Sequence, residues 1–121
     1  MKMQEVEEIL QLLDEIRQKN LLVVVEGVKD ARALKELGII HILSLKKPLF
    51  AVVEEIASKE REVVLLTDLD DEGKKLYHEL SRGLQKHGVK IDNRLRGRLF
   101  KTPIRHVEGL SGYLARAQEP S

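Results

Sequence analysis

The chain has 121 residues with 21 basic and 20 acidic side chains, so its net charge of +1 creates no overall field that attracts an anionic partner. The length favours one domain, and the absence of cysteine excludes disulfides, zinc–thiolate sites, iron–sulfur clusters and thiol catalysis. Because there is no apolar run of about 18 residues, we expect a cytoplasmic protein that makes no membrane contact. The charged fraction of 34% is typical of a thermophilic source.

The first half of the chain alternates between helical and strand patterns. Apolar residues recur with helical spacing over residues 3–19, which predicts an amphipathic helix within an N-terminal segment, residues 1–20. The continuous apolar run 21–25 predicts a buried parallel strand. The order that we predict after it is a helix over 30–37 closed by Gly38, a strand over 39–43, and a helix from Pro48 to about Ser58.

The second half continues the alternation and completes the main domain, residues 21–117. We predict a strand over 63–66, a helix over 72–86, a strand over 89–91, a short strand around 106–107, a terminal helix over 110–117 and a disordered tail over 118–121. Successive strand–helix units imply right-handed crossovers. The expected class is therefore α/β, with a central, mostly parallel sheet of about four strands between two layers of helices.

Acidic side chains follow two of the predicted strands. Glu26 follows the run 21–25, and Asp68 and Asp70 follow the strand 63–66. Ligands bind open parallel sheets beyond the carboxyl ends of the strands, so these carboxylates converge if the two strands are neighbours. Carboxylates gathered at one edge repel, and a bound hard cation relieves that repulsion. The all-oxygen ligand set predicts Mg²⁺ or Mn²⁺.

These residues form two motifs that resemble the Toprim domain of topoisomerases, bacterial-type primases and the nuclease that matures 5S ribosomal RNA. The motifs are hhhEGxxDxxxL at residues 23–34 and hhhTDxDxxGxxL at residues 64–76, where h is apolar. The resemblance covers roughly residues 21–110 and is greatest to small stand-alone Toprim proteins. As in the 5S ribosomal RNA maturation nucleases, the pair Val107-Glu108 follows a basic stretch. The resemblance implies a Rossmann-like, three-layer fold.

The resemblance also implies roles for the matching residues. Glu26 is expected to act as general acid or base and also to belong to the metal site, in which Asp68 and Asp70 are expected to hold Mg²⁺. The implied activity is Mg²⁺-dependent cleavage of structured RNA. Those nucleases carry an extra RNA-binding domain that this sequence lacks, which suggests a protein partner or self-association. The supporting residues that we expect are Gly27 in a tight turn near phosphate, Asp30 and Gly73 at helix starts, and Glu108 near the metal.

A basic segment, residues 74–105, predicts a nucleic-acid surface, with RNA favoured over DNA by the resemblance. The segment contains ten basic and two acidic side chains. Three of its arginines stand at every second position, so in an extended segment they project on one side and form a phosphate-binding strip. The residues expected to contact nucleic acid are Lys74, Arg94, Arg96, Arg98 and Lys101.

Other interpretations of the same residues stay open. The main alternative is a non-catalytic, nucleic-acid-binding subunit whose carboxylates only hold a metal. A haloacid-dehalogenase-like phosphatase also has Asp-x-Asp after an apolar strand, but it needs Thr or Val where this chain has Glu72. Topoisomerase activity needs a nucleophilic Tyr on a separate domain. We expect Asp71 and Glu72 to be solvated capping residues and His106 to be structural.

Overall fold

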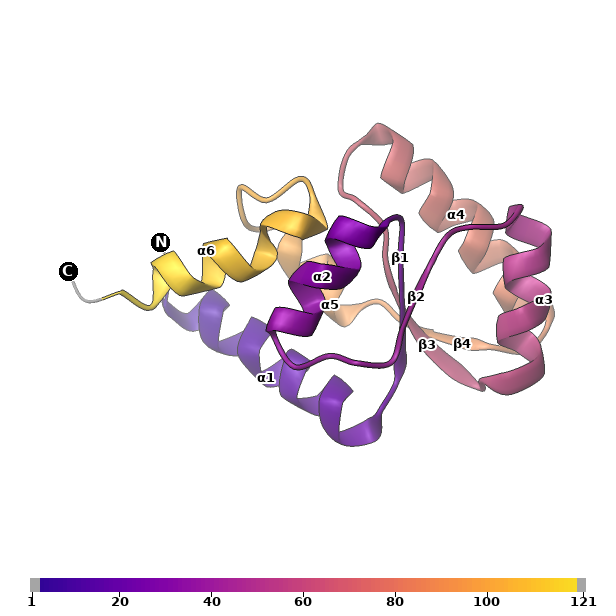
Figure 1. Ribbon diagram of the computed structural model, residues 1–121, viewed down its shortest axis with the longest axis horizontal. Helices are drawn as coiled ribbons and strands as arrows, with labels where there is room; N and C mark the ends of the chain where they lie inside the picture. The colour runs from indigo at the N-terminus through magenta and orange to yellow at the C-terminus, as the bar shows by residue number, and fades with distance from the viewer. Residues whose placement is uncertain (1–2, 120–121) are drawn as a thin grey trace.

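A computed structural model describes residues 3–119 of the chain. Its centre is a four-stranded parallel sheet in the order β2-β1-β3-β4 (Figure 1). The strands are β1 (Leu22–Val25), β2 (Ile42–Ser44), β3 (Glu62–Leu66) and β4 (Lys90–Asp92). The α/β class with a parallel sheet of four strands is therefore confirmed.

The two central strands are apolar on both faces because helices cover both faces. Val23, Val25, Val64 and Leu66 point into one hydrophobic core, and the residues between them point into a second core on the opposite face. This burial explains why β1 reads as an unbroken apolar run rather than as an alternating pattern.

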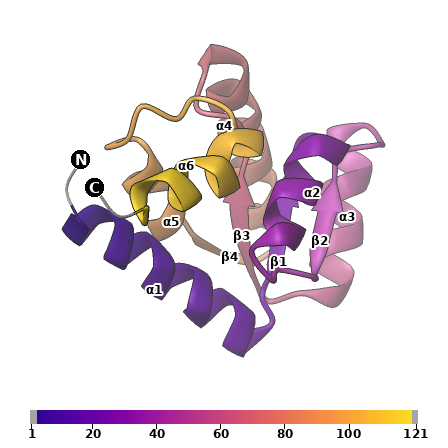
Figure 2. The same cartoon turned by 60° about the vertical axis from the view of Figure 1, so that its left-hand side comes forward.

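Helices form the outer two layers (Figures 1 and 2). One face is covered by α1 (Met3–Lys19), α2 (Val28–Glu36), α5 (Arg94–Leu99), the 3₁₀ turn η1 (Val107–Gly109) and α6 (Leu110–Ala117). The other face is covered by α3 (Leu49–Lys59) and α4 (Asp71–Lys86). The first and last helices, α1 and α6, lie side by side, so the apolar stripe of α1 is buried in the same core as the sheet.

Two helices, α2 and α4, end in turns of the same type, and the first of these turns shows that one predicted strand boundary is wrong. After α2, Gly38 takes φ of +84° and donates its N–H to the Lys35 carbonyl, while Ile39 donates to Leu34. Gly88 repeats this arrangement after α4. Because Ile39 completes the helix end and the Ile40 side chain is 80% exposed, β2 starts at Ile42 and the predicted strand 39–43 begins too early.

The C-terminal quarter differs from two further expectations. The predicted strand around 106–107 is wrong, because Val107 donates its N–H to a side chain and begins the turn η1. The prediction that the three alternating arginines lie in an extended segment is also wrong, because residues 94–99 form the helix α5. Gln118 and Glu119 of the expected disordered tail stay hydrogen-bonded to α6, whereas residues 1–2 and 120–121 lie outside the described residues.

Among residues 3–119, no helix combines the length and the apolar character needed to cross a membrane.

Candidate functional site

Glu26 and Asp68 meet at the carboxyl edge of the sheet, where the strand order reverses. β1 and β3 are hydrogen-bonded neighbours, with Val25 opposite Leu66. Glu26 follows β1, and its Oε2 accepts a 2.6 Å hydrogen bond from the backbone N–H of Asp68. The predicted adjacency of these two acids is therefore confirmed, and it follows from the switch in direction from β2 on one side of β1 to β3 on the other.

The two aspartates each have one oxygen fixed by a backbone N–H. Asp68 Oδ1 accepts from Val107 at 2.9 Å. Asp70 Oδ1 accepts from Gly73 at 2.8 Å, so Asp70, not Asp71 or a later acid, is the N-cap of α4. The second oxygen of each carboxylate turns toward the same space, which is the arrangement that a cation between them requires.

His106 also enters this space, although we expected it to be a structural residue. Its Nδ1 lies 3.3 Å from Asp68 Oδ2 and 3.9 Å from Asp70 Oδ2. One ligand atom from each of these three residues lies within 4.8 Å of the other two. The signal in the sequence was slight: a histidine directly before the Val107-Glu108 pair. Only the fold shows that this segment returns to the sheet edge.

Backbone groups connect the segment that carries His106 to the loop between β3 and α4, residues 67–70, which we call the acidic loop. Leu69 donates its N–H to the Arg105 carbonyl at 2.8 Å, and the Val107 N–H reaches Asp68 two residues further along. These two bonds hold the loop after β3 against the start of η1. The His106 ring is 57% exposed, so it is held near the carboxylates from the solvent side.

Burial and neighbouring charges favour a proton on Glu26. Desolvation raises the pKa of Glu26, the hydrogen bond from the Asp68 N–H opposes that rise, and the negative charges of Asp68, Asp70 and Asp30 raise the pKa further. The same crowding acts on Asp30, whose pKa is raised first by burial and then by the charge of Asp68. Glu26 is therefore suited to hold a proton to a higher pH than an ordinary glutamate and to exchange it during a reaction.

The expected supporting residues have distinct places. Asp30 Oδ2 accepts the Gly27 N–H at 3.0 Å and fixes the start of α2. A tight turn does not require Gly27, because its φ is −144° and an added Cβ has Asp30 at 3.9 Å as its nearest contact. Glu108 is exposed on η1, and its charge contributes to the raised pKa of Asp30.

Gly73 is required by a close approach of backbone segments. A Cβ at this position stands 1.9 Å from the carbonyl oxygen of Asp68, and the Gly73 carbonyl accepts a 2.7 Å hydrogen bond from the buried Thr67 hydroxyl. Any side chain at position 73 displaces the loop that carries Asp68.

We expect Gly73→Ala to destabilise the protein by at least about 2 kcal/mol, because backbone atoms must move to relieve the clash. Gly97→Ala is the matched control: its Cβ has open space in the exposed part of α5, so the change is expected to be neutral or stabilising by about 0.5–1 kcal/mol. Urea unfolding midpoints measure both. Equal midpoints for the two variants contradict the close packing described for Gly73.

The three alternating arginines do not form one strip, because α5 turns them in different directions. Arg94 forms ion pairs with Asp92 and with Glu15 of α1, at 2.9 and 2.7 Å. Arg98 pairs with Glu8 of α1 at 2.7 Å. These arginines tie α5 to α1, with part of their charge already neutralised.

Arg96 lies behind the acidic loop. The side chain donates to the Asp68 carbonyl at 3.0 Å and lies near the Thr67 carbonyl at 3.4 Å, and Arg96 is only 6% exposed. Its guanidinium carbon is 4.4 Å from the Tyr77 ring centre and 5.0 Å from that of Phe100. Arg96 therefore positions the loop backbone. Of the other predicted contacts, Lys74 and Lys101 are exposed, and the Lys74 Nζ is 5.7 Å from the Phe100 ring centre.

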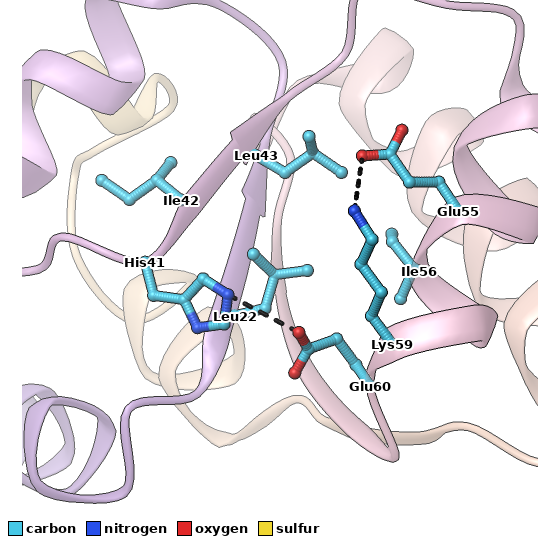
Figure 3. Close-up of a pocket in the computed structure, with 8 residues that line it drawn as sticks. All are labelled: Leu22, His41, Ile42, Leu43, Glu55, Ile56, Lys59 and Glu60. Atoms are coloured by element: carbon cyan, nitrogen blue, oxygen red, sulfur yellow. Dashed lines mark ion pairs between the residues drawn. The ribbon is translucent and has the colours of Figure 1, made fainter.

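A separate hollow of about 180 Å³ lies near the opposite end of β1 (Figure 3). It is lined by Leu22 at the start of that strand and by residues of β2 and α3. Figure 3 shows His41 facing Glu60 and Lys59 facing Glu55. The His41 Nε2 is 3.6 Å from a Glu60 carboxylate oxygen, and the Lys59 Nζ is 4.0 Å from one of Glu55. Glu55 and Glu60 each face a nitrogen-bearing side chain, and among residues 3–119 no group of three metal-ligating side chains gathers at this hollow.

The chain is similar to a known domain family, to other proteins in sequence and to a solved structure. The family model for the Toprim domain matches residues 21–96. The chain is 34% identical to a UPF0292 protein of Methanosarcina barkeri, over 95% of this chain and 84% of that protein. It is 35% identical to a UPF0292 protein of Thermococcus gammatolerans, over 85% and 80%. A solved structure described as a putative protein from Aquifex aeolicus is similar with a TM-score of 0.75 and 29% identity, over 84% of this chain and 94% of that one.

The chain belongs to the Toprim domain family. The curated relatives named above are UPF0292 proteins, which are small Toprim-type proteins of about this length. Membership indicates a function related to nucleic acids and a divalent-metal site, and the Asp68, Asp70 and His106 cluster is a candidate for that site.

Proposed function

We propose that the protein is a metal-dependent nuclease that cleaves phosphodiester bonds in structured RNA. The observation that carries this proposal is the meeting of Glu26, with its raised pKa, and the Asp68–Asp70 pair at one sheet edge. Phosphodiester cleavage needs charge neutralisation on the phosphate and a group that transfers a proton, and this edge offers a candidate for each.

The aspartates fit a hard divalent cation such as Mg²⁺ or Mn²⁺. In each one a backbone N–H fixes Oδ1, so that Oδ2 is left in a constant position facing the shared space. Carboxylate oxygens are the protein ligands that both ions favour. A cation bound there supplies a positive charge that neutralises phosphoryl oxygens and positions the scissile phosphate.

Glu26 is the proposed proton-transfer group. Its Oε2 is held by the Asp68 N–H, so the carboxyl group stays directed at the acidic loop while its protonation changes. Arg96 and Gly73 keep the loop backbone in place from behind, through the Asp68 carbonyl. In this arrangement Asp68 and Asp70 bind and orient, and Glu26 accepts or donates the proton at the oxygen that attacks or leaves.

The substrate assignment rests on charge and on resemblance. The segment 74–105 has an excess of basic side chains, and Lys74 and Lys101 are exposed. Because Arg94 and Arg98 are paired with acids of α1, we assign phosphate contact first to these two lysines. Arg105 is a further candidate, because it is exposed and its Nη1 donates only to backbone carbonyls, which leaves its charge unpaired by an acid among the described residues. The similarity of the motifs to 5S ribosomal RNA maturation nucleases favours RNA. A protein partner or a second copy of the chain is proposed to extend the binding surface.

The test is a cleavage assay on hairpin RNA, single-stranded RNA, and single- and double-stranded DNA, each with Mg²⁺, with Mn²⁺ and with a chelator. We expect metal-dependent cleavage of hairpin RNA that the chelator abolishes. Cleavage in the chelator contradicts the metal site. A parallel binding titration on the same nucleic acids and a phosphate-release assay on a phosphomonoester separate the alternatives. Metal-dependent binding without cleavage favours the accessory subunit, and phosphate release without nucleic-acid cleavage favours the phosphatase.

A further inference from the structure

The position of His106 relative to the two aspartates suggests more than a structural role. The His106 Nδ1 atom faces Oδ2 of both Asp68 and Asp70. In each aspartate a backbone N–H binds Oδ1, so Oδ2 is the oxygen that remains for a cation. The carbonyl of Arg105 and the N–H of Val107, on either side of His106, are bonded to the acidic loop. The imidazole is thus aimed at the cation position by the backbone on both sides of it.

The three ligand atoms also have the spacing of a coordination sphere. They lie within 4.8 Å of one another, and metal–ligand bonds of about 2.0–2.2 Å place opposite ligands up to about 4.4 Å apart. The His106 Nδ1 atom is 3.3 Å from Asp68 Oδ2 and 3.9 Å from Asp70 Oδ2, so both of its distances already fall within that limit. A site of carboxylates and water suits Mg²⁺, whereas an imidazole ligand shifts preference toward transition-metal ions.

We infer that His106 is a third ligand of the cation held by Asp68 and Asp70, and that its imidazole makes this centre bind Mn²⁺ in preference to Mg²⁺. The inference rests on the proposed metal site but not on nuclease activity. His106 supplies a nitrogen donor from the solvent side, opposite the loop backbone that Arg96 and Gly73 hold. Glu26 is then left to transfer the proton.

Mn²⁺ binding to the full chain, at about pH 8 where a free imidazole is neutral, tests this inference. Calorimetry gives the affinities for Mn²⁺ and Mg²⁺, and pulsed electron paramagnetic resonance of bound Mn²⁺ detects coordinated imidazole nitrogen. We expect the nitrogen signal in the wild type. We expect His106→Ala to abolish it and to weaken Mn²⁺ binding by about 10-fold or more, while Mg²⁺ affinity changes by less than about 3-fold.

His78→Ala is the matched control, because His78 is an exposed histidine on α4 whose ring contacts Tyr77 and is absent from the acid cluster. It should keep both the nitrogen signal and the wild-type affinities. The inference is overturned if wild-type Mn²⁺ shows no nitrogen coupling, or if His106→Ala leaves Mn²⁺ affinity unchanged. Tighter binding by His106→Ala also overturns it, because the ring then competes with the cation. A protein that binds Mn²⁺ in the expected way but cuts no RNA leaves this inference standing and refutes the proposed nuclease.

Discussion

Glu26→Gln is expected to reduce RNA cleavage by about 10²–10⁴-fold while RNA affinity stays within about 2-fold of wild type. An amide has nearly the shape of the carboxyl group and its oxygen can still accept the Asp68 N–H, so the edge keeps its geometry and loses only the transferable proton. Single-turnover cleavage and a separate binding titration measure the two effects. Glu36→Gln, an exposed change of the same kind on α2, is the control and should keep full activity.

The same substitution should not lower the free energy of unfolding of the metal-free protein at neutral pH. A carboxyl whose pKa is higher in the folded than in the unfolded state stabilises the fold at low pH, and that contribution is lost as pH rises from the ordinary Glu range through the folded pKa. Glu26→Gln removes this loss, so its unfolding free energy at pH 7 is expected to equal or exceed that of wild type.

In the activity assay, cleavage at the wild-type rate by Glu26→Gln removes Glu26 from the mechanism.

Asp68→Asn is expected to weaken divalent-metal binding by at least about 100-fold and to bring cleavage to background. In the proposed site Asp68 contributes its carboxylate to the metal position, while its backbone groups contact Glu26 and Arg96, so the substitution removes a charge at the centre of that site. An asparagine oxygen can still accept the Val107 N–H, which keeps the loop attached to η1. Calorimetry with Mn²⁺ measures the loss directly.

Asp71→Asn is the control for this change. Asp71 is an exposed acid in the first turn of α4, so the substitution removes the same charge close to the site without removing a member of the acid cluster. We expect Mn²⁺ affinity within about 3-fold of wild type, the loss expected for a screened neighbouring charge. Equal affinity losses at positions 68 and 71 indicate a general attraction of cations to an acidic surface rather than a coordinated ion.

The parts of the fold that follow from local pattern were predictable. The apolar runs of β1 and β3 have the composition of strands buried on both faces, and the spacing in α1 has one apolar side, so element types follow from burial periodicity. The start of β2 was harder to predict, because Ile39 and Ile40 are as apolar as strand residues, whereas Ile39 completes the helix-ending turn at Gly38 and Ile40 is exposed. Apolar character alone does not separate these two uses.

The residues of the candidate site also divide into those that the sequence predicts and those that only the fold brings there. Glu26 and Asp68 were predictable because each directly follows a buried strand and parallel strands end at one edge. Arg96 was not, because its two-residue spacing from Arg94 fits an extended strip as well as a helix, and only tertiary packing buries it. His106 reaches the site through hydrogen bonds between segments 38 residues apart, a pairing that no local pattern contains.

An anomalous difference map from crystals of the wild-type protein soaked in Mn²⁺ tests the central claim most directly. The account predicts a peak about 2.0–2.2 Å from Oδ2 of Asp68 and of Asp70, within reach of Glu26 directly or through one water. A map with its Mn²⁺ peak elsewhere, or with no peak between these aspartates at saturating Mn²⁺, contradicts the account.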